Sequence, residues 1–238
     1  MKQIKRITVL STVLSILCLL SISCSQEDIL EEKLNESSFY LKNVDGSLID
    51  KIEPELISPI YEDLKSNGKI NEAVSFLKNY NDKGKYIGDV SDVDIVKASN
   101  PSFYYGVHLQ NTGWIYGNDS SVDVTPSYYT FGTTGEHRRL EAFYLILNNT
   151  NICYESHLQN IGWNQGVSCN GSITGTTGES RRMEAIKISL DSGVGFVLYQ
   201  AHLAGTGWES GWAYNGDVSG TIGQSRRLEA FRLRFLLY

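Results

Sequence analysis

The clearest alternation of apolar and polar residues lies near the C-terminal end of the chain and occurs three times. The shared pattern Glu-Ala-(Phe or Ile)-x-(Leu or Ile)-x-(Leu or Phe) begins at Glu141, Glu184 and Glu229. Apolar residues recur at every second position, which is typical of a β-strand with one face turned to a core. The sequence therefore predicts three equivalent strands.

Two further strings accompany each of these strands. One is HLQNTGW, HLQNIGW or HLAGTGW, and the other is GTTGEHRR, GTTGESRR or GTIGQSRR. In every copy the Trp follows the His by six residues, and the Arg pair starts six residues after the first Gly. Self-similarity of this kind predicts one structural unit used three times. The copies span about 101–148, 149–192 and 193–238, and we call them the first, second and third copy.

The third copy shows the expected strands of one unit. FVLYQAHLAG predicts a strand that ends at a turn, a second strand runs from Trp208 to Tyr214, and Asn215-Gly216 predicts a hairpin into a short third strand. With the alternating strand this gives about four strands per copy and about twelve in all. The first copy has eighteen residues from its Trp to the Gly of the GTxG string, against twelve in the others, which indicates a longer surface loop.

The predicted fold is all-β with pseudo-threefold symmetry, built from three four-stranded units. A β-trefoil and a β-prism both fit, because closure removes exposed sheet edges, and we favour the trefoil narrowly. An open solenoid is less attractive because neither terminal copy resembles a polar cap.

A short helical segment precedes the copies. Leu48, Ile49, Ile52 and Leu56 recur at helical spacing, but Pro54 and Pro59 interrupt it. A helical hairpin with its turn at Asn67-Gly68 could be completed by Ile60, Leu64, Ile70, Ala73, Val74 and Leu77. Residues 24–100 are expected to form an acidic stalk with short helices and a linker at 84–100. A helical pair packed on the repeats is equally compatible.

The N-terminus predicts an export signal. MKQIKR followed by an apolar run is typical of a secretory signal peptide, and residues 1–23 are excluded from the fold. Cys24 ends this run and resembles the lipidation site of a bacterial lipoprotein, although Ser21 stands where Leu is usual. Simple secretion and a retained single-span anchor are the alternatives. The acidic SQEDILEE resembles a surface-export signal, so we expect an exported protein anchored by lipid to the bacterial outer membrane or cell surface.

Composition limits the class of binding partner, and the cysteines allow a disulfide. With 27 acidic and 21 basic residues the chain is mildly acidic, which argues against nucleic-acid binding. Cys153 and Cys169 lie only in the second copy, where a disulfide or two buried thiols are both compatible with export. A bond that the other copies lack cannot define the fold.

A polar set recurs in all three copies. One Arg of each pair is expected to bond the Glu of the same or a neighbouring unit. A catalytic constellation normally occurs once, so we predict a structural role, no metal, no cofactor and no enzyme. Three His converging on a zinc ion is a remote alternative, and His137 is expected to be a solvated loop residue. The set comprises His108, His157, His202, Arg138, Arg139, Arg181, Arg182, Arg226, Arg227, Glu141, Glu184 and Glu229.

The repeated Trp114, Trp163 and Trp208 have two interpretations. Each could fill one third of the core, or form the floor of a sugar or peptide subsite. Aromatics present in one copy only are better ligand candidates, because repetition favours a structural role. These are Trp212 and, in the first-copy insertion, Tyr116, Tyr128 and Tyr129.

Together, H-L-x-x-x-G-W and G-T-x-G-x-x-R-R-x-E-A resemble the clostridial hydrophobic-W (ChW) repeat, matched three times over residues 101–238. A ChW repeat usually has a second aromatic soon after GW. Only Trp212 provides it, whereas Gly166 and the first-copy insertion depart from the pattern. The resemblance implies a surface-attached, non-catalytic module for adhesion, binding a polysaccharide or a cell-surface protein. A structural subunit of the cell envelope is the runner-up, and the oligomeric state stays open.

Overall fold

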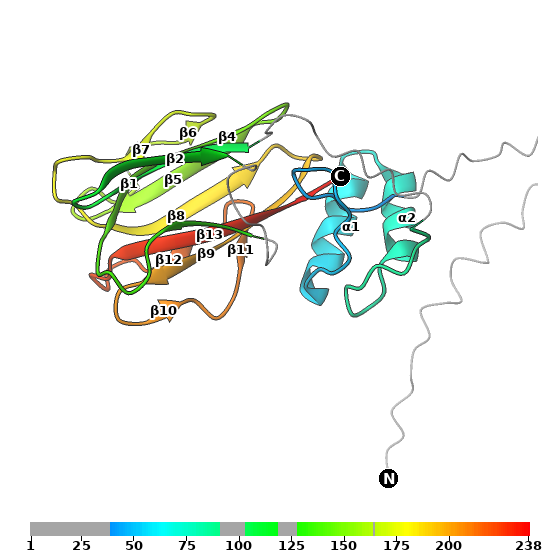
Figure 1. The fold of residues 1–238 in the computed structure, drawn as a ribbon. Coiled ribbons are helices and arrows are strands. Elements are labelled where there is room, and N and C mark those ends of the chain that lie inside the picture. Colours follow the sequence, from blue (N-terminus) through cyan, green and yellow to red (C-terminus); the bar gives the residue numbers. More distant parts are fainter. Residues whose placement is uncertain (1–38, 91–102, 119–127, 164) are drawn as a thin grey trace, which may run out of the picture. The chain divides into compact units, whose positions relative to one another are not determined.

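The protein is mostly β, with three antiparallel sheets and an N-terminal helical segment (Figure 1). The computed structural model describes residues 39–90, 103–118, 128–163 and 165–238. The expected signal peptide and Cys24 lie outside these residues. In the described part of the chain, no helix is long and apolar enough to cross a membrane.

The helical hairpin forms at the predicted place, but the apolar spacing was partly misinterpreted. Leu48, Ile49 and Ile52 lie in bridges and irregular structure before the first helix, not in a helix. In the second helix, the predicted residues Ile70, Val74 and Leu77 are exposed, and the buried residues are Ala73 and Phe76. A 3-10 turn, η2 (Pro54–Leu56), leads into α1 (Ile57–Ser66), and α2 (Ile70–Asn79) follows after a short turn. Pro59 does not interrupt α1, since it lies in the first turn, where its missing N–H would have no helical partner. Gly68 supplies the positive φ of the turn.

The strands follow the three copies. In the first copy they are β1 (Phe103–Leu109), β2 (Gly113–Asn118), β3 (Tyr129–Gly132) and β4 (Leu140–Leu147). In the second copy they are β5 (Ile152–Leu158), β6 (Ser168–Cys169), β7 (Thr174–Gly175) and β8 (Met183–Leu190). In the third copy they are β9 (Gly195–Leu203), β10 (Gly207–Trp208), β11 (Ala213–Tyr214), β12 (Ser219–Gly220) and β13 (Leu228–Leu237).

Each sheet takes one strand from the next copy. The sheet orders are β2-β1-β4-β7, β6-β5-β8-β12 and β10-β9-β13-β3, with β11 also on β9. We call them the first, second and third sheet. The exchange is cyclic, because β3 of the first copy pairs with β13 of the third. The predicted four-stranded unit is therefore not the unit of structure.

The Asn-Gly signal was interpreted wrongly as a hairpin. Strand β11 pairs with β9 in the third sheet, whereas β12 pairs with β8 in the second. Asn215 holds the crossing point, because its side chain bonds the Val197 N–H and the Gly195 carbonyl, and the Gly216 N–H donates to Ile188 of the second copy. The turn geometry is as expected, but the chain continues into another sheet.

The core lies between the sheets and draws on all three copies. The alternating strands turn Phe143, Ile186 and Phe231 inward, and each is fully buried. A second apolar cluster joins the helical segment to the outer face of the third sheet through Phe196, Leu198 and Leu236. An ion pair between Arg234 and Glu53 lies beside it. These contacts are those of a helical pair packed on the repeats rather than of a separate stalk.

Candidate binding surface on the outer faces of the sheets

The repeated polar set forms one Arg–Glu–His cluster in each copy. In the second copy, Arg182 Nε lies 2.8 Å from Glu184 Oε1, and His157 Nδ1 lies 3.1 Å from Glu184 Oε2. The corresponding Arg–Glu distances are 2.6 Å in the first copy and 2.7 Å in the third. The predicted Arg–Glu contact is confirmed, and it is made by the second Arg of each pair within its own copy.

The clusters are buried and repeated. The glutamates are 3–5 % exposed, and their carboxylates neutralise the arginines that fix the chain before β4, β8 and β13. The histidine Nδ1 atoms lie 3.0–3.5 Å from the carboxylate oxygens without forming a hydrogen bond. In the described part of the chain no group of three or more His, Cys, Asp or Glu is placed to hold a metal ion.

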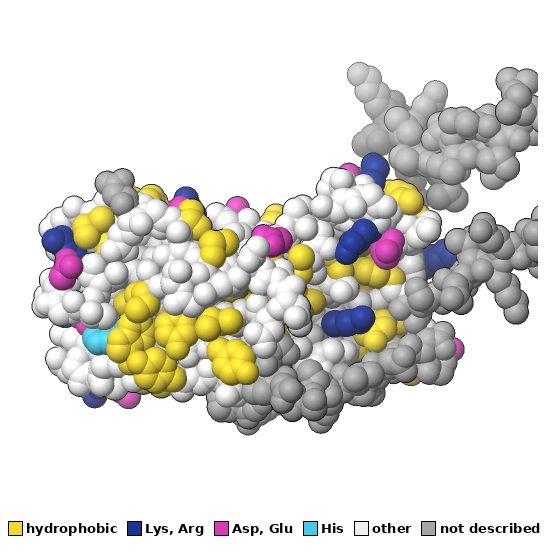
Figure 2. Space-filling model, turned by 90° about the horizontal axis from the view of Figure 1, so that it is seen from above, with side chains coloured by type: hydrophobic (Ala, Val, Ile, Leu, Met, Phe, Trp, Pro, Cys, Tyr) yellow, Lys and Arg dark blue, Asp and Glu magenta, His cyan; other side chains and the backbone are white. Residues whose placement is uncertain are grey.

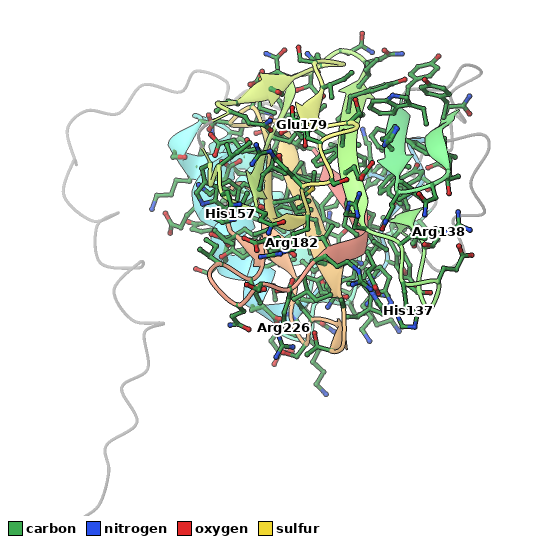
Figure 3. All side chains as sticks on the ribbon, turned by 90° about the vertical axis from the view of Figure 1, so that its left-hand side faces the viewer. His137, Arg138, His157, Glu179, Arg182 and Arg226 are labelled. Atoms are coloured by element: carbon green, nitrogen blue, oxygen red, sulfur yellow. A yellow bond between two sulfur atoms is a disulfide. The ribbon has the colours of Figure 1, made fainter. Side chains whose placement is uncertain are left out.

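The first Arg of the pairs lies toward solvent. Arg181 pairs with Glu179 at 2.7 Å, and Arg138 with Glu136 at 3.0 Å, and the four side chains are 35–53 % exposed. Figure 3 looks onto the end of the β domain that carries the GTxG loops, where the labelled polar side chains of the copies are spread around this end. His137 is 83 % exposed, as expected of a solvated loop residue.

Each repeated Trp packs against the histidine of its own copy. The ring centroids of His108 and Trp114 lie 5.4 Å apart in an edge-to-face arrangement, and the other two pairs lie 5.3 and 5.1 Å apart. All three Trp are half-buried, and none belongs to the buried core. Of the two interpretations of these residues, core filling is therefore wrong.

The side chain facing each Trp differs between copies. It comes from one position of the alternating strand, and it is Tyr144, Lys187 or Arg232. Tyr144 lies 5.9 Å from Trp114, the Lys187 ammonium lies 4.5 Å above Trp163, and the Arg232 guanidinium lies 4.6 Å above Trp208. These three residues were not predicted, although they occupy the unspecified x after Glu-Ala-(Phe or Ile).

The unique aromatics of the third sheet surround Arg232. Its guanidinium lies 4.5 Å from the Tyr128 ring and 4.9 Å from the Trp212 ring, and both rings are half-buried. Cation–π contacts of this kind stabilise the packing. Trp212 is thus engaged within the fold.

Tyr129 does not lie on the surface. It is 6 % exposed, and its ring packs against Phe103 at 5.0 Å and Phe235 at 6.3 Å. Strand alternation explains this correction, because neighbouring residues of β3 point to opposite faces and Tyr129 points to the core. Its proposed role as a ligand contact is therefore wrong.

The first sheet displays its aromatics openly. Tyr116 is 64 % exposed, and its ring lies 6.0 Å from Trp114 with the two planes within 10°. Tyr116 and Tyr144 meet above Gly106, because a Cβ there would lie 2.4 Å from the Tyr144 ring. Figure 2 shows hydrophobic side chains gathered beside a histidine on this side of the molecule.

Cys153 and Cys169 form a disulfide between β5 and β6. The sequence left this bond open. Leu198 and Tyr214 occupy the corresponding pair in the third copy, so the bond reinforces one sheet that the fold also builds without it.

Comparison with known proteins identifies the repeats. Residues 157–192 and 202–236 match the family model described as "Clostridial hydrophobic W". The first copy lies outside both matched ranges. No curated protein and no solved structure matches the chain. Residues 157–236 therefore contain two repeats of the clostridial hydrophobic W (ChW) family.

Proposed function

We propose that residues 101–238 form a non-catalytic module that binds carbohydrate on the surface of an exported lipoprotein. One observation carries this proposal: each sheet places a half-exposed Trp, held by a histidine, at the same position of its outer face. An aromatic ring face stacks well against the apolar face of a sugar ring, while its edge stays in polar surroundings.

The proposal includes anchoring through Cys24. The basic and apolar N-terminus and the position of this Cys support lipidation. A lipid-anchored module with weak sites would hold the cell to an extended polysaccharide, which is an adhesion-type role. The disulfide agrees with export, since an oxidising compartment is where such bonds form.

We further infer a β-prism in preference to the trefoil favoured by the sequence. Two four-stranded sheets and one five-stranded sheet, which exchange one strand each in a cycle, support this architecture. In such an arrangement the three outer faces point in different directions, so each can differ in what it binds.

A glycan array tests the binding function, using the mature chain labelled at its N-terminus. We expect saturable binding to at least one polysaccharide class. If no glycan is retained, a protein partner or the role of an envelope subunit replaces carbohydrate binding, and capture by cross-linking on intact cells would follow.

A further inference from the structure

The outer face of the first sheet is neutral. Strands β1 and β2 contain no Lys, Arg, Asp or Glu, and β4 contains only Glu141, which is buried. Register places Tyr104, Gly106, Trp114, Tyr116, Tyr144 and Ile146 on this face. As far as the described residues show, the face therefore offers aromatic and aliphatic surface without a fixed charge.

The other two outer faces are occupied by the protein's own charged side chains. In the second sheet, Lys187 covers Trp163 and pairs with Glu155 at 3.6 Å. In the third, Arg232 covers Trp208. A ligand would not displace it easily, because its Nε also donates a hydrogen bond to Gln200 at 2.8 Å. A ligand ring would have to displace these cations. Within the described parts of the chain, the first sheet alone presents its Trp without a covering cation.

A shallow hollow of about 540 Å³ continues this face beyond the end of β4. Ile146 belongs to both, and amide and carboxylate side chains line the hollow, among them Asn149, Asn151, Asn170 and Asp191. These groups are held in place, since Asn151 donates to Asp191 and accepts from Asn170, both at 2.8 Å. None of the described residues that line it is a Lys or an Arg. Amides offer both donors and acceptors, which is what sugar hydroxyls require.

We propose that these two surfaces form one track for a neutral polysaccharide chain, running along β4 from Trp114 to the Asn-lined hollow. The inference rests on the proposed carbohydrate binding and assigns it to the first sheet. Pyranose rings stack on Trp114, Tyr116 and Tyr144, and hydroxyls of the following sugars bond the amides of the hollow. An acidic polymer would find no cation there and would meet Asp191.

The close packing of the rings on this face favours a sugar chain over a proline-rich peptide. Peptides of that kind dock into grooves between aromatic ridges. Here the rings of Tyr116 and Tyr144, 6.4 Å apart, converge above Gly106 and fill the space between β2 and β4. The two rings are tilted by 38° to each other and occupy the space above β1 that a proline ring would need.

Affinity electrophoresis and calorimetry of the mature chain with soluble β-glucan, α-mannan and arabinogalactan test the track, with polygalacturonate and a polyproline peptide as contrasting probes. We expect a neutral polysaccharide to bind, and Tyr116→Ala to weaken it roughly tenfold, the size of one aromatic anchor. Gly106→Ala keeps every aromatic residue but pushes the two Tyr rings apart, and should weaken binding similarly. Asp191→Ala releases Asn151 and should cost several-fold.

Ile222→Ala is the control, because it removes another exposed hydrophobic side chain, in the GTxG loop of the third copy. If the wild type binds a neutral polysaccharide and the Tyr116 and Gly106 variants bind it equally, the track is wrong while carbohydrate binding stands. If no polysaccharide binds, both proposals fail. Preferential binding of polygalacturonate or polyproline, lost in Tyr116→Ala, would overturn the ligand class.

Discussion

Gly175 of the second copy lies directly against Ala142 of the first, so that a Cβ on Gly175 would come within 2.6 Å of the Ala142 Cα. The same approach joins Gly132 to Ala230 and Gly220 to Ala185. At each junction the next residue, a Thr, donates its N–H to the carbonyl of the neighbouring copy's Glu at 2.9–3.2 Å. The Gly-Thr and Glu-Ala parts of the repeat are therefore two sides of one contact between copies.

Substituting Gly175 should break this contact. Gly175→Ala introduces a Cβ that also meets the Glu141 carbonyl oxygen at 2.3 Å, and backbone cannot move aside cheaply. We expect a loss of at least about 3 kcal/mol in the free energy of unfolding. Gly178→Ala is the control, since it has a positive φ of 76° but open space around it, and should cost about 1 kcal/mol. Equal urea midpoints for the two variants would contradict the junction.

The buried cluster should stabilise far more than the exposed pair in the same loop. Glu184→Gln removes the charge that faces Arg182, and we expect a loss of about 2–3 kcal/mol in urea unfolding. Glu179→Gln removes an exposed partner of Arg181 and should change stability by less than about 0.5 kcal/mol. A loss of similar size in both variants would mean that burial does not set the strength of these pairs.

The disulfide should stabilise without being required for folding. It closes a loop of sixteen residues, and reduction is expected to cost about 3 kcal/mol, or roughly 6–12 °C in Tm. Calorimetry with and without dithiothreitol measures this. The variant Cys153→Ala/Cys169→Ala should fold, melt near the reduced wild type and ignore the reductant. If the melting temperature of this variant still falls on addition of dithiothreitol, the prediction is wrong.

Stability should fall in alkaline solution. Burial raises the pKa of Tyr199, whose hydroxyl donates to the Asp217 carbonyl, and of Tyr154, which donates to Ser172 at 2.7 Å. The folded protein then holds these protons more tightly than the unfolded chain does. Their contribution is complete below the unfolded pKa of about 10 and is lost as the pH rises toward the folded value.

Urea unfolding between pH 8 and 11.5 would show this loss. We expect a decline above pH 10 of about 1.4 kcal/mol per pH unit for each such tyrosine. Tyr199→Phe should lower the plateau at pH 8 by about 1 kcal/mol and flatten the decline. An unchanged slope in that variant would assign the alkaline sensitivity to other groups.

Much of the local structure follows from the sequence because it depends on neighbours along the chain. The alternation in RLEAFRLRF predicted β13, the spacing around Ile60 and Leu64 predicted α1, and Asn67-Gly68 marked the turn before α2. The Arg–Glu contacts were also predictable, since Arg182 and Glu184 are two residues apart and share one face of a strand.

Contacts between distant segments were decided only by the tertiary structure. The strand exchange sends β12 to β8, although Asn215-Gly216 alone indicates a local hairpin. Tyr129 is buried because Phe235, more than a hundred residues further on, packs against it.

The candidate site shows the same division. The sequence determined that three equivalent Trp exist, because each Trp follows a His by the same number of residues in all three copies. It did not determine which Trp stays open to a ligand, because the covering side chain comes from another strand: Tyr144, Lys187 or Arg232. Packing across strands cannot be inferred from a local sequence pattern. It is this packing that leaves one outer face aromatic and covers the Trp of the other two with a Lys or an Arg.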